Sequence, residues 1–97
     1  MFMLPEARQS IVEKVRAAEP EEMLSALRGF YEEFPAEKAT LGEMVMTYGH
    51  SRHHCETLGA DYVRLSRLDM LRLEYYAMLE RLEELKKNKE ETQPNIL

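Results

Sequence analysis

The fold is decided by residues 61–88, which read DYVRLSRLDMLRLEYYAMLERLEELKKN. No glycine or proline interrupts this stretch, and most of its residues favour the α-helix. A row of apolar residues, spaced alternately by three and four, runs through its C-terminal part: Leu68, Leu71, Tyr75, Met78, Leu82 and Leu85. This heptad seam predicts a helix that buries one stripe against another helix.

A second apolar row lies well round the same predicted helix. Its members are Val63, Met70, Leu73 and Ala77. A helix that is apolar on two sides usually has two neighbours, and the two N-terminal helices are expected to cover only one row and part of the face that runs from Leu41 to Leu65. The remaining apolar surface predicts homo-oligomerisation, with a dimer as the smallest unit, through the seam residues.

The N-terminal part of the chain predicts two short amphipathic helices separated by prolines. Apolar residues spaced by three and four run from Leu4 to Ala18, and Pro5 suits the first residue of a helix. Pro20 and Pro35 each end one helix and allow the next to begin, because the residue before a proline disfavours the helical backbone. The second helix has an apolar face made of Met23, Leu24, Leu27, Phe30, Tyr31 and Phe34.

The segment that begins near residue 36 has two interpretations. Its apolar face consists of Leu41, Met44, Val45, Tyr48, Cys55, Leu58, Tyr62 and Leu65. The seam continues on a different face, so either one long helix changes partners or the chain breaks near Gly59. Gly59 suits the position after a helix and Asp61 suits an N-cap, which favours a helical hairpin. An unbroken helix over residues 36–88 would be about 75–80 Å long, too long for two short helices to cover.

We therefore predict an all-α fold, with two short N-terminal helices packed on a long helical hairpin or a kinked long helix, and with a coiled-coil-like C-terminal half. With 97 residues, of which 44% are hydrophobic and 32% charged, the chain predicts one helical domain over residues 1–88 and a flexible tail over residues 89–97. The net charge of −5 argues against a nucleic-acid surface. No apolar run is long enough for a membrane span, and a single cysteine forms no internal disulfide. A cytoplasmic location is expected.

Residues 48–56, YGHSRHHCE, contain all three histidines and the one cysteine. On a continuous helix His50 and His54 lie at i,i+4, with Glu43 two turns earlier on the same face, which predicts a candidate divalent-metal site. The alternative is a polar outer face on which the histidines make surface hydrogen bonds. Cys55 falls on the apolar face, where a free cysteine is expected to pack in the core.

Arginines gather beside the seam in an otherwise acidic chain. Asp61 and Arg64, like Asp69 and Arg72, are spaced at i,i+3, which predicts surface ion pairs. Arg64 and Arg67 also lie close to the expected interface. They are candidates for binding a small anion or a nucleotide in a groove between subunits.

No residues of the sequence match a catalytic motif, and we expect a protein that is not an enzyme. Five tyrosines and seven methionines add the kind of side chain that is common at interfaces. We expect a protein–protein interaction module, such as a small regulator, inhibitor, adaptor or chaperone. Its expected partners are a second copy of the chain and another protein, and it needs no cofactor unless His50, His54 and Glu43 hold a metal.

Overall fold

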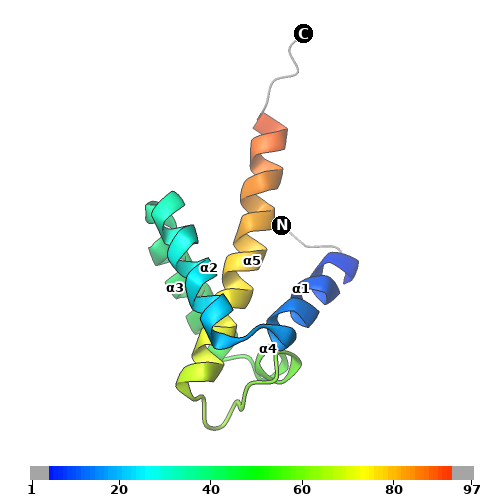
Figure 1. Ribbon diagram of the computed structural model, residues 1–97. Coiled ribbons are helices and arrows are strands. Elements are labelled where there is room, and N and C mark those ends of the chain that lie inside the picture. The colour runs from blue at the N-terminus through cyan, green and yellow to red at the C-terminus, as the bar shows by residue number, and fades with distance from the viewer. Residues whose placement is uncertain (1–4, 93–97) are drawn as a thin grey trace.

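The computed structural model describes residues 5–92, and over this range the protein is all-α, as the sequence predicts. The elements are α1 (Pro5–Ala17), α2 (Pro20–Glu33), the 3-10 turn η1 (Pro35–Glu37), α3 (Lys38–Gly49), α4 (Arg52–Thr57) and α5 (Arg67–Thr92). Figure 1 shows α5 in the middle, with α2 and α3 on one side, α1 on the other and α4 near the base. The helices α1, α2 and α3 each pack against α5.

The prolines act as the sequence predicts. Pro20 is the first residue of α2 and Pro35 begins η1, so both connections are very short. The N–H of Phe34 donates to the carbonyl of Phe30 at 2.7 Å, which closes the end of α2 before the chain turns. Short corners of this kind force α2 and α3 to lie close together.

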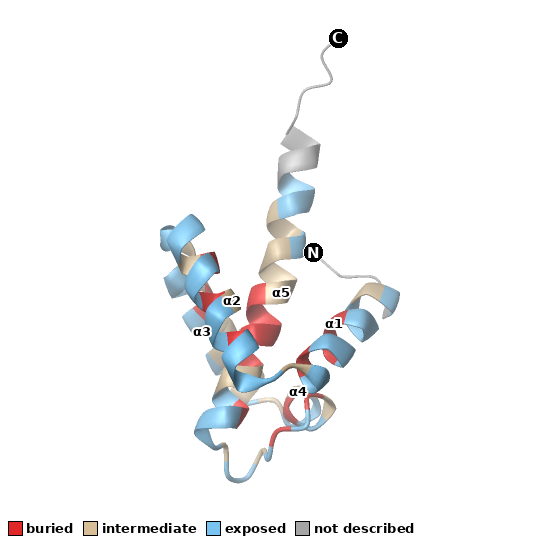
Figure 2. Ribbon diagram, in the orientation of Figure 1, coloured by how far each residue is buried: buried red, intermediate tan, exposed pale blue. Residues whose placement is uncertain are grey.

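The core is built around the middle of α5. Five of its residues lie almost entirely inside the protein: Leu73, Tyr75, Tyr76, Ala77 and Met78. Because successive residues of a helix point about 100° apart, these side chains face every side of α5. The surrounding helices contribute Ile11, Val12, Val15, Met23, Leu27, Phe30 and Leu41. Figure 2 shows the resulting buried band halfway along α5.

The chain breaks near Gly59, as the hairpin interpretation predicts, and the alternative of one long helix is wrong. Gly59 has φ +79°, the left-handed conformation that favours glycine after a helix. The N–H of Ala60 donates to the carbonyl of Cys55 at 2.8 Å, and the N–H of Gly59 to that of Glu56 at 3.1 Å. These two bonds form a Schellman motif that ends α4.

Two details of the hairpin prediction need correction. Its first arm is interrupted, because α3 ends at Gly49 and Ser51 caps α4 by accepting a hydrogen bond from the N–H of His54. Asp61 is not the N-cap of the second arm: α5 begins at Arg67, after Ser66. Asp61 instead accepts backbone N–H groups in the preceding loop, and a local turn of this kind competes with helix formation.

The C-terminal part of α5 extends further than expected. The helix continues to Thr92, past the predicted boundary at residue 88, and the remaining residues of the predicted tail lie outside the described range. Three different helices pack against α5, so the coiled-coil-like pairing of the C-terminal half stays a prediction. Within the described range, no helix combines the length and the hydropathy needed to cross a membrane.

Replacing Gly59 with alanine should destabilise the protein by about 1–2 kcal/mol, because φ +79° strains a residue that has a Cβ atom. The added Cβ would also lie 3.7 Å from Nη1 of Arg16. Gly42→Ala is the matched control: this position lies inside α3 with open space around it, so alanine should stabilise the helix by about 0.5–1 kcal/mol. Urea unfolding followed by circular dichroism measures both changes, and two shifts of the same sign would contradict the assignment of Gly59.

Candidate functional site

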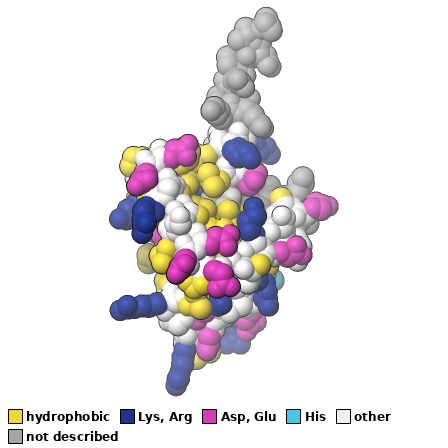
Figure 3. Space-filling view, in the orientation of Figure 1, with side chains coloured by type: hydrophobic (Ala, Val, Ile, Leu, Met, Phe, Trp, Pro, Cys, Tyr) yellow, Lys and Arg dark blue, Asp and Glu magenta, His cyan; other side chains and the backbone are white. Residues whose placement is uncertain are grey.

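The seam residues of α5 lie in two environments. Tyr75 and Met78 are 4% and 3% exposed, so they belong to the core of the monomer rather than to a subunit contact. The other members lie toward the two ends of α5 and stay accessible: Leu68 is 38% exposed, and Leu71, Leu82 and Leu85 are half-buried. Figure 3 shows hydrophobic side chains that reach the surface along the middle of one face, flanked by acidic and basic groups.

The second apolar row is divided in the same way. Leu73 and Ala77 are fully buried, whereas Met70 is 40% exposed and Val63, in the loop before α5, is 77% exposed. In the middle of the helix, α5 has more cover than the two N-terminal helices were expected to give, because α3 also packs against it. Here α1, α2 and α3 surround α5 and cover both rows.

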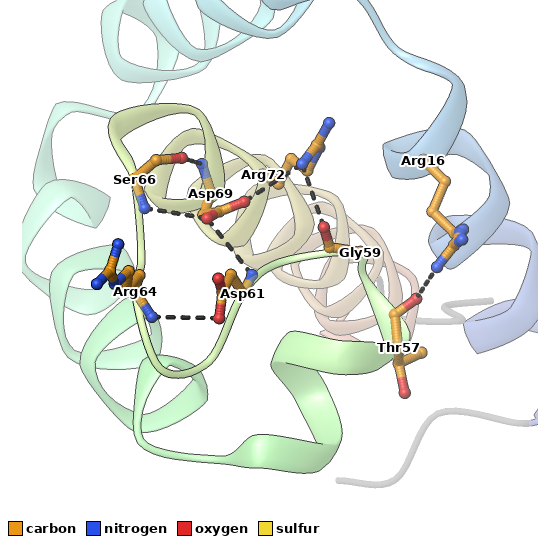
Figure 4. Close-up of polar contacts among 8 residues, drawn as sticks. All are labelled: Arg16, Thr57, Gly59, Asp61, Arg64, Ser66, Asp69 and Arg72. Atoms are coloured by element: carbon orange, nitrogen blue, oxygen red, sulfur yellow. Dashed lines mark hydrogen bonds and ion pairs between the residues drawn. The ribbon is translucent and has the colours of Figure 1, made fainter.

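Asp69 fastens the loop of residues 58–66 to α5 (Figure 4). Its carboxylate accepts the N–H of Ser66 at 3.0 Å, and its own N–H donates to Oγ of Ser66 at 3.1 Å, which makes a capping box. The N–H of Asp61 donates to the same carboxylate oxygen at 3.4 Å. The predicted pair with Arg72 is confirmed at 3.3 Å. Asp69 is 7% exposed, so these donors compensate for the loss of water around its charge.

The electrostatics of Asp69 favour its charged form. Burial alone would raise its pKa, but the hydrogen bonds from Ser66 and Asp61 and the charge of Arg72 together hold the pKa below its ordinary value of 3.8. The sequence contains a capping-box motif, Ser-x-x-Asp, from Ser66 to Asp69. The sequence prediction nevertheless started the helix five residues earlier, because Asp61 is also a suitable N-cap.

Arg64 and Arg67 do not meet in the monomer at an enclosed site. Both are exposed, one in the loop before α5 and the other at the first residue of α5. Oδ1 of Asp61 accepts the backbone N–H of Arg64 at 3.2 Å, a turn contact in place of the predicted ion pair. A groove between subunits is absent from a single chain, so the anion site at Arg64 and Arg67 stays a prediction.

Two other arginines converge on the end of α4 (Figure 4): Arg72, which the sequence predicts only as the ion-pair partner of Asp69, and Arg16, which no sequence pattern singled out. Nη1 of Arg16 donates to the carbonyl of Thr57 at 2.9 Å, and Nη1 of Arg72 donates to the carbonyl of Gly59 at 3.3 Å. Cations are favourable at the C-terminal end of a helix, where carbonyl groups lack partners. No sequence signal pairs residues 41 positions apart.

The histidine-rich run wraps around the junction of α3 and α4. His50 follows the last residue of α3 and is exposed. The ring of His54 stacks on Tyr48 with centroids 4.5 Å apart, and its Nδ1 lies 2.9 Å from Oγ of Ser51. Burial lowers the pKa of His54 below 6.5, although the nearby carboxylate of Glu80 opposes this shift. The structure thus holds His54 as a neutral ring in a packed junction.

The predicted metal ligands are not brought together. The prediction needs His50, His54 and Glu43 on one continuous helix, but the break at Ser51 separates α3 from α4. Among the residues that the structure describes, no group of three or more His, Cys, Asp or Glu side chains is placed to hold a metal ion. The i,i+4 geometry assumed for His50 and His54 is therefore wrong.

Cys55 is fully buried, which confirms its predicted place in the core. Its thiol lies 3.4 Å from the carbonyl oxygen of Tyr48, to which it donates. Burial raises the pKa of Cys55, and the charges of Asp69 and Glu56 raise it further. Because the thiolate is the reactive form of cysteine, this environment keeps the side chain unreactive.

Hydrogen bonds from Tyr31 and Tyr48 to glutamates, also unexpected from the sequence, tie α2 and α3 to α5, and a third bond of this kind, from Tyr76, lies within α5. Glu80 accepts hydrogen bonds from the hydroxyls of both Tyr48 and Tyr76, the latter at 2.9 Å. The hydroxyl of Tyr31 donates to Glu74 at 2.6 Å. Burial, and then these carboxylates, raise the pKa of the three tyrosines, so each hydroxyl stays a donor. In the sequence, the signal that could have indicated these hydrogen bonds was the preference for tyrosine over phenylalanine, because tyrosine carries a hydroxyl group.

Comparison with protein-family models, with curated proteins and with solved structures gives no match for this chain. With no match to a known protein, a function for this chain is inferred from the geometry of the protein itself.

Asp69→Asn should destabilise the protein by about 1–3 kcal/mol at neutral pH, because the charge-assisted bonds to Ser66, Asp61 and Arg72 are weakened. Asp61→Asn is the matched control in the same loop. Its side chain is exposed and asparagine forms the same turn, so the change should stay within about 0.5 kcal/mol.

The effect of Asp69→Asn should also depend on pH. The folded pKa of Asp69 lies below its ordinary value of 3.8, so its carboxylate stabilises the fold fully above that pH and loses this contribution as the pH falls through the folded pKa. Urea unfolding of the variant and the wild type at several pH values should show their difference shrinking below about pH 4. A difference that stays constant down to pH 2 would contradict the role of the charge.

Proposed function

We propose that the protein is a non-enzymatic protein–protein interaction module that acts as a homo-oligomer, with α5 as its main contact surface. The observation that carries this proposal is the accessibility of the seam toward both ends of α5. Leu68 and Leu71 precede the enclosed middle of the helix, and Leu82 and Leu85 follow it. Figure 1 shows that α5 also rises beyond the ends of the other helices.

Burying these accessible leucines in a contact between two copies would stabilise the dimer. Complete burial of one leucine side chain contributes about 1.5–3 kcal/mol of free energy. Because the seam leucines are only partly buried in the monomer, part of this stabilisation is missing at each of them. A second copy that places its own α5 against the same stripe would recover it. Closed two-fold pairing is the commonest arrangement of such surfaces, and antiparallel packing of helices from two copies would suit it.

The reactive side chains support a role without catalysis. Cys55 is buried and its pKa is raised, and the hydroxyls of Tyr31, Tyr48 and Tyr76 donate to glutamates. The bonds of Tyr31 and Tyr48 hold α2 and α3 against α5. Regulator, inhibitor, adaptor and chaperone are all functions compatible with this surface, which would also accept another protein. A cytoplasmic location, expected from the sequence, is part of the proposal.

Light scattering at micromolar concentration tests the oligomer. The wild-type protein should have at least twice the monomer mass of 11.4 kDa, and the double variant Leu82→Gln/Leu85→Gln should shift toward 11.4 kDa because it places amides on the contact stripe. Met46→Gln is the control: Met46 is 66% exposed on α3, away from the seam, and its replacement should leave the mass unchanged.

Circular dichroism of the double variant checks that the helices persist, since Leu82 and Leu85 are half-buried. A wild-type mass of 11.4 kDa across the concentration range would refute the homo-oligomer. A mass that falls equally in the Met46→Gln control would place the contact somewhere other than α5.

A further inference from the structure

A pocket of about 170 Å³ lies at the C-terminal end of α4, and two cationic side chains from distant parts of the chain line it. Its lining residues are Arg16, Leu58, Gly59 and Arg72. Arg16 comes from the last turn of α1 and Arg72 from the second turn of α5. The pocket is therefore a place where α1, the end of α4 and α5 meet.

Both guanidinium groups lie against Gly59. A Cβ atom built on this glycine would be 3.7 Å from Nη1 and 3.9 Å from Cζ of Arg16, and the glycine carbonyl accepts a hydrogen bond from Arg72 at 3.3 Å. The missing side chain leaves the space between the two cations open. The positive φ of Gly59 gives this position a structural reason to be glycine.

The arginines keep hydrogen-bonding capacity for a ligand. Across the described part of the chain, the hydrogen bonds of Arg16 and Arg72 to protein acceptors all run through Nη1. A guanidinium also carries N–H groups on Nη2 and Nε, so each arginine has further donors. Side-chain exposure of 27% for Arg72, with Arg16 more exposed still, leaves these donors accessible to a small molecule.

The local charge stays positive. The carboxylate next to the pocket belongs to Asp69, which pairs with Arg72 through Oδ1 while Oδ2 accepts the N–H groups of Ser66 and Asp61. The charged residues that line the pocket itself are both arginines. In a protein of net charge −5, this concentration of positive charge is a local exception.

We propose that this pocket binds a phosphate group. A carboxylate is planar and pairs well with a single guanidinium, whereas a tetrahedral phosphate presents oxygens in several directions and accepts from two guanidiniums on different helices. Its charge of about −1.5 to −2 at neutral pH also suits a site with two cations. The pocket is open to solvent, so the group is either free phosphate or the end of a larger phosphomonoester.

Binding should stabilise the protein, because the phosphate would join α1 to α5 across the end of α4. A ligand that binds only the folded state raises its stability in proportion to the logarithm of ligand concentration above the Kd. This gives a simple measurement: thermal unfolding at constant ionic strength, with inorganic phosphate, AMP or chloride added in turn. Constant ionic strength separates site binding from general screening.

We expect a saturable rise in Tm with inorganic phosphate or AMP and none with chloride. Arg16→Gln and Arg72→Gln should each weaken the affinity by about tenfold or more, since each removes one charge-assisted contact. Arg64→Gln is the matched control, because Arg64 is exposed in the neighbouring loop and does not line the pocket. Equal affinities for the two probes would indicate free phosphate, and tighter binding of AMP would indicate a phosphomonoester.

Nuclear magnetic resonance of the wild-type protein keeps the test independent of the variants' stability. Phosphate should shift the amide signals of Gly59 and Ala60 in proportion to site occupancy. The proposal is overturned if those signals stay fixed while others move, if chloride reproduces the rise in Tm, or if Arg64→Gln weakens binding as much as the pocket variants. None of these outcomes bears on the mass of the oligomer, so the two proposals fail separately.

Discussion

The structure depends on the burial of α5 around its whole circumference halfway along its length. Leu73, Tyr75, Tyr76, Ala77 and Met78 are all shielded from water, and their side chains point to every side of the helix. One neighbouring helix covers only one stripe, so this pattern requires several neighbours. The three helices α1, α2 and α3 supply them. The enclosure of α5 therefore depends on all three helices together.

Enclosure by apolar contact does not by itself fix how each helix is oriented, and the polar ties of α5 supply that information. Glu80 receives hydroxyl groups from Tyr48 and Tyr76, and Glu74 receives that of Tyr31. A partly buried carboxylate without donors would destabilise the fold, so the bond from Tyr31 selects one register of α2 along α5 and the bond from Tyr48 one register of α3; the bond from Tyr76 lies within α5. Hydrogen bonds therefore specify an arrangement that burial stabilises.

The sequence predicted the features that depend on neighbouring residues and missed those that depend on distant ones. The prolines at positions 20 and 35, the break at Gly59 and the core position of Cys55 were all readable from local chemistry. The metal hypothesis failed because it assumed an unbroken helix, and Ser51 begins a new one. The seam predicted a stripe on α5, but periodicity says nothing about which neighbour covers each turn. The convergence of Arg16 and Arg72 needed the folded chain, since no spacing rule connects them.

The same geometry explains why apolar residues of α5 stay accessible toward its two ends rather than at its middle. The short helices α1, α2 and α3 have 12 to 14 residues, whereas α5 has 26, so they cannot cover its full length. A helix rises about 1.5 Å per residue, which leaves on the order of 20 Å of α5 beyond the reach of a neighbour. Near the first end of α5, Arg72 of α5 and Arg16 of α1 meet the end of α4, and at the other end half-buried leucines continue the seam. Accessible apolar residues therefore lie on both sides of the buried middle of α5, and the arginine pair lies near its first end only.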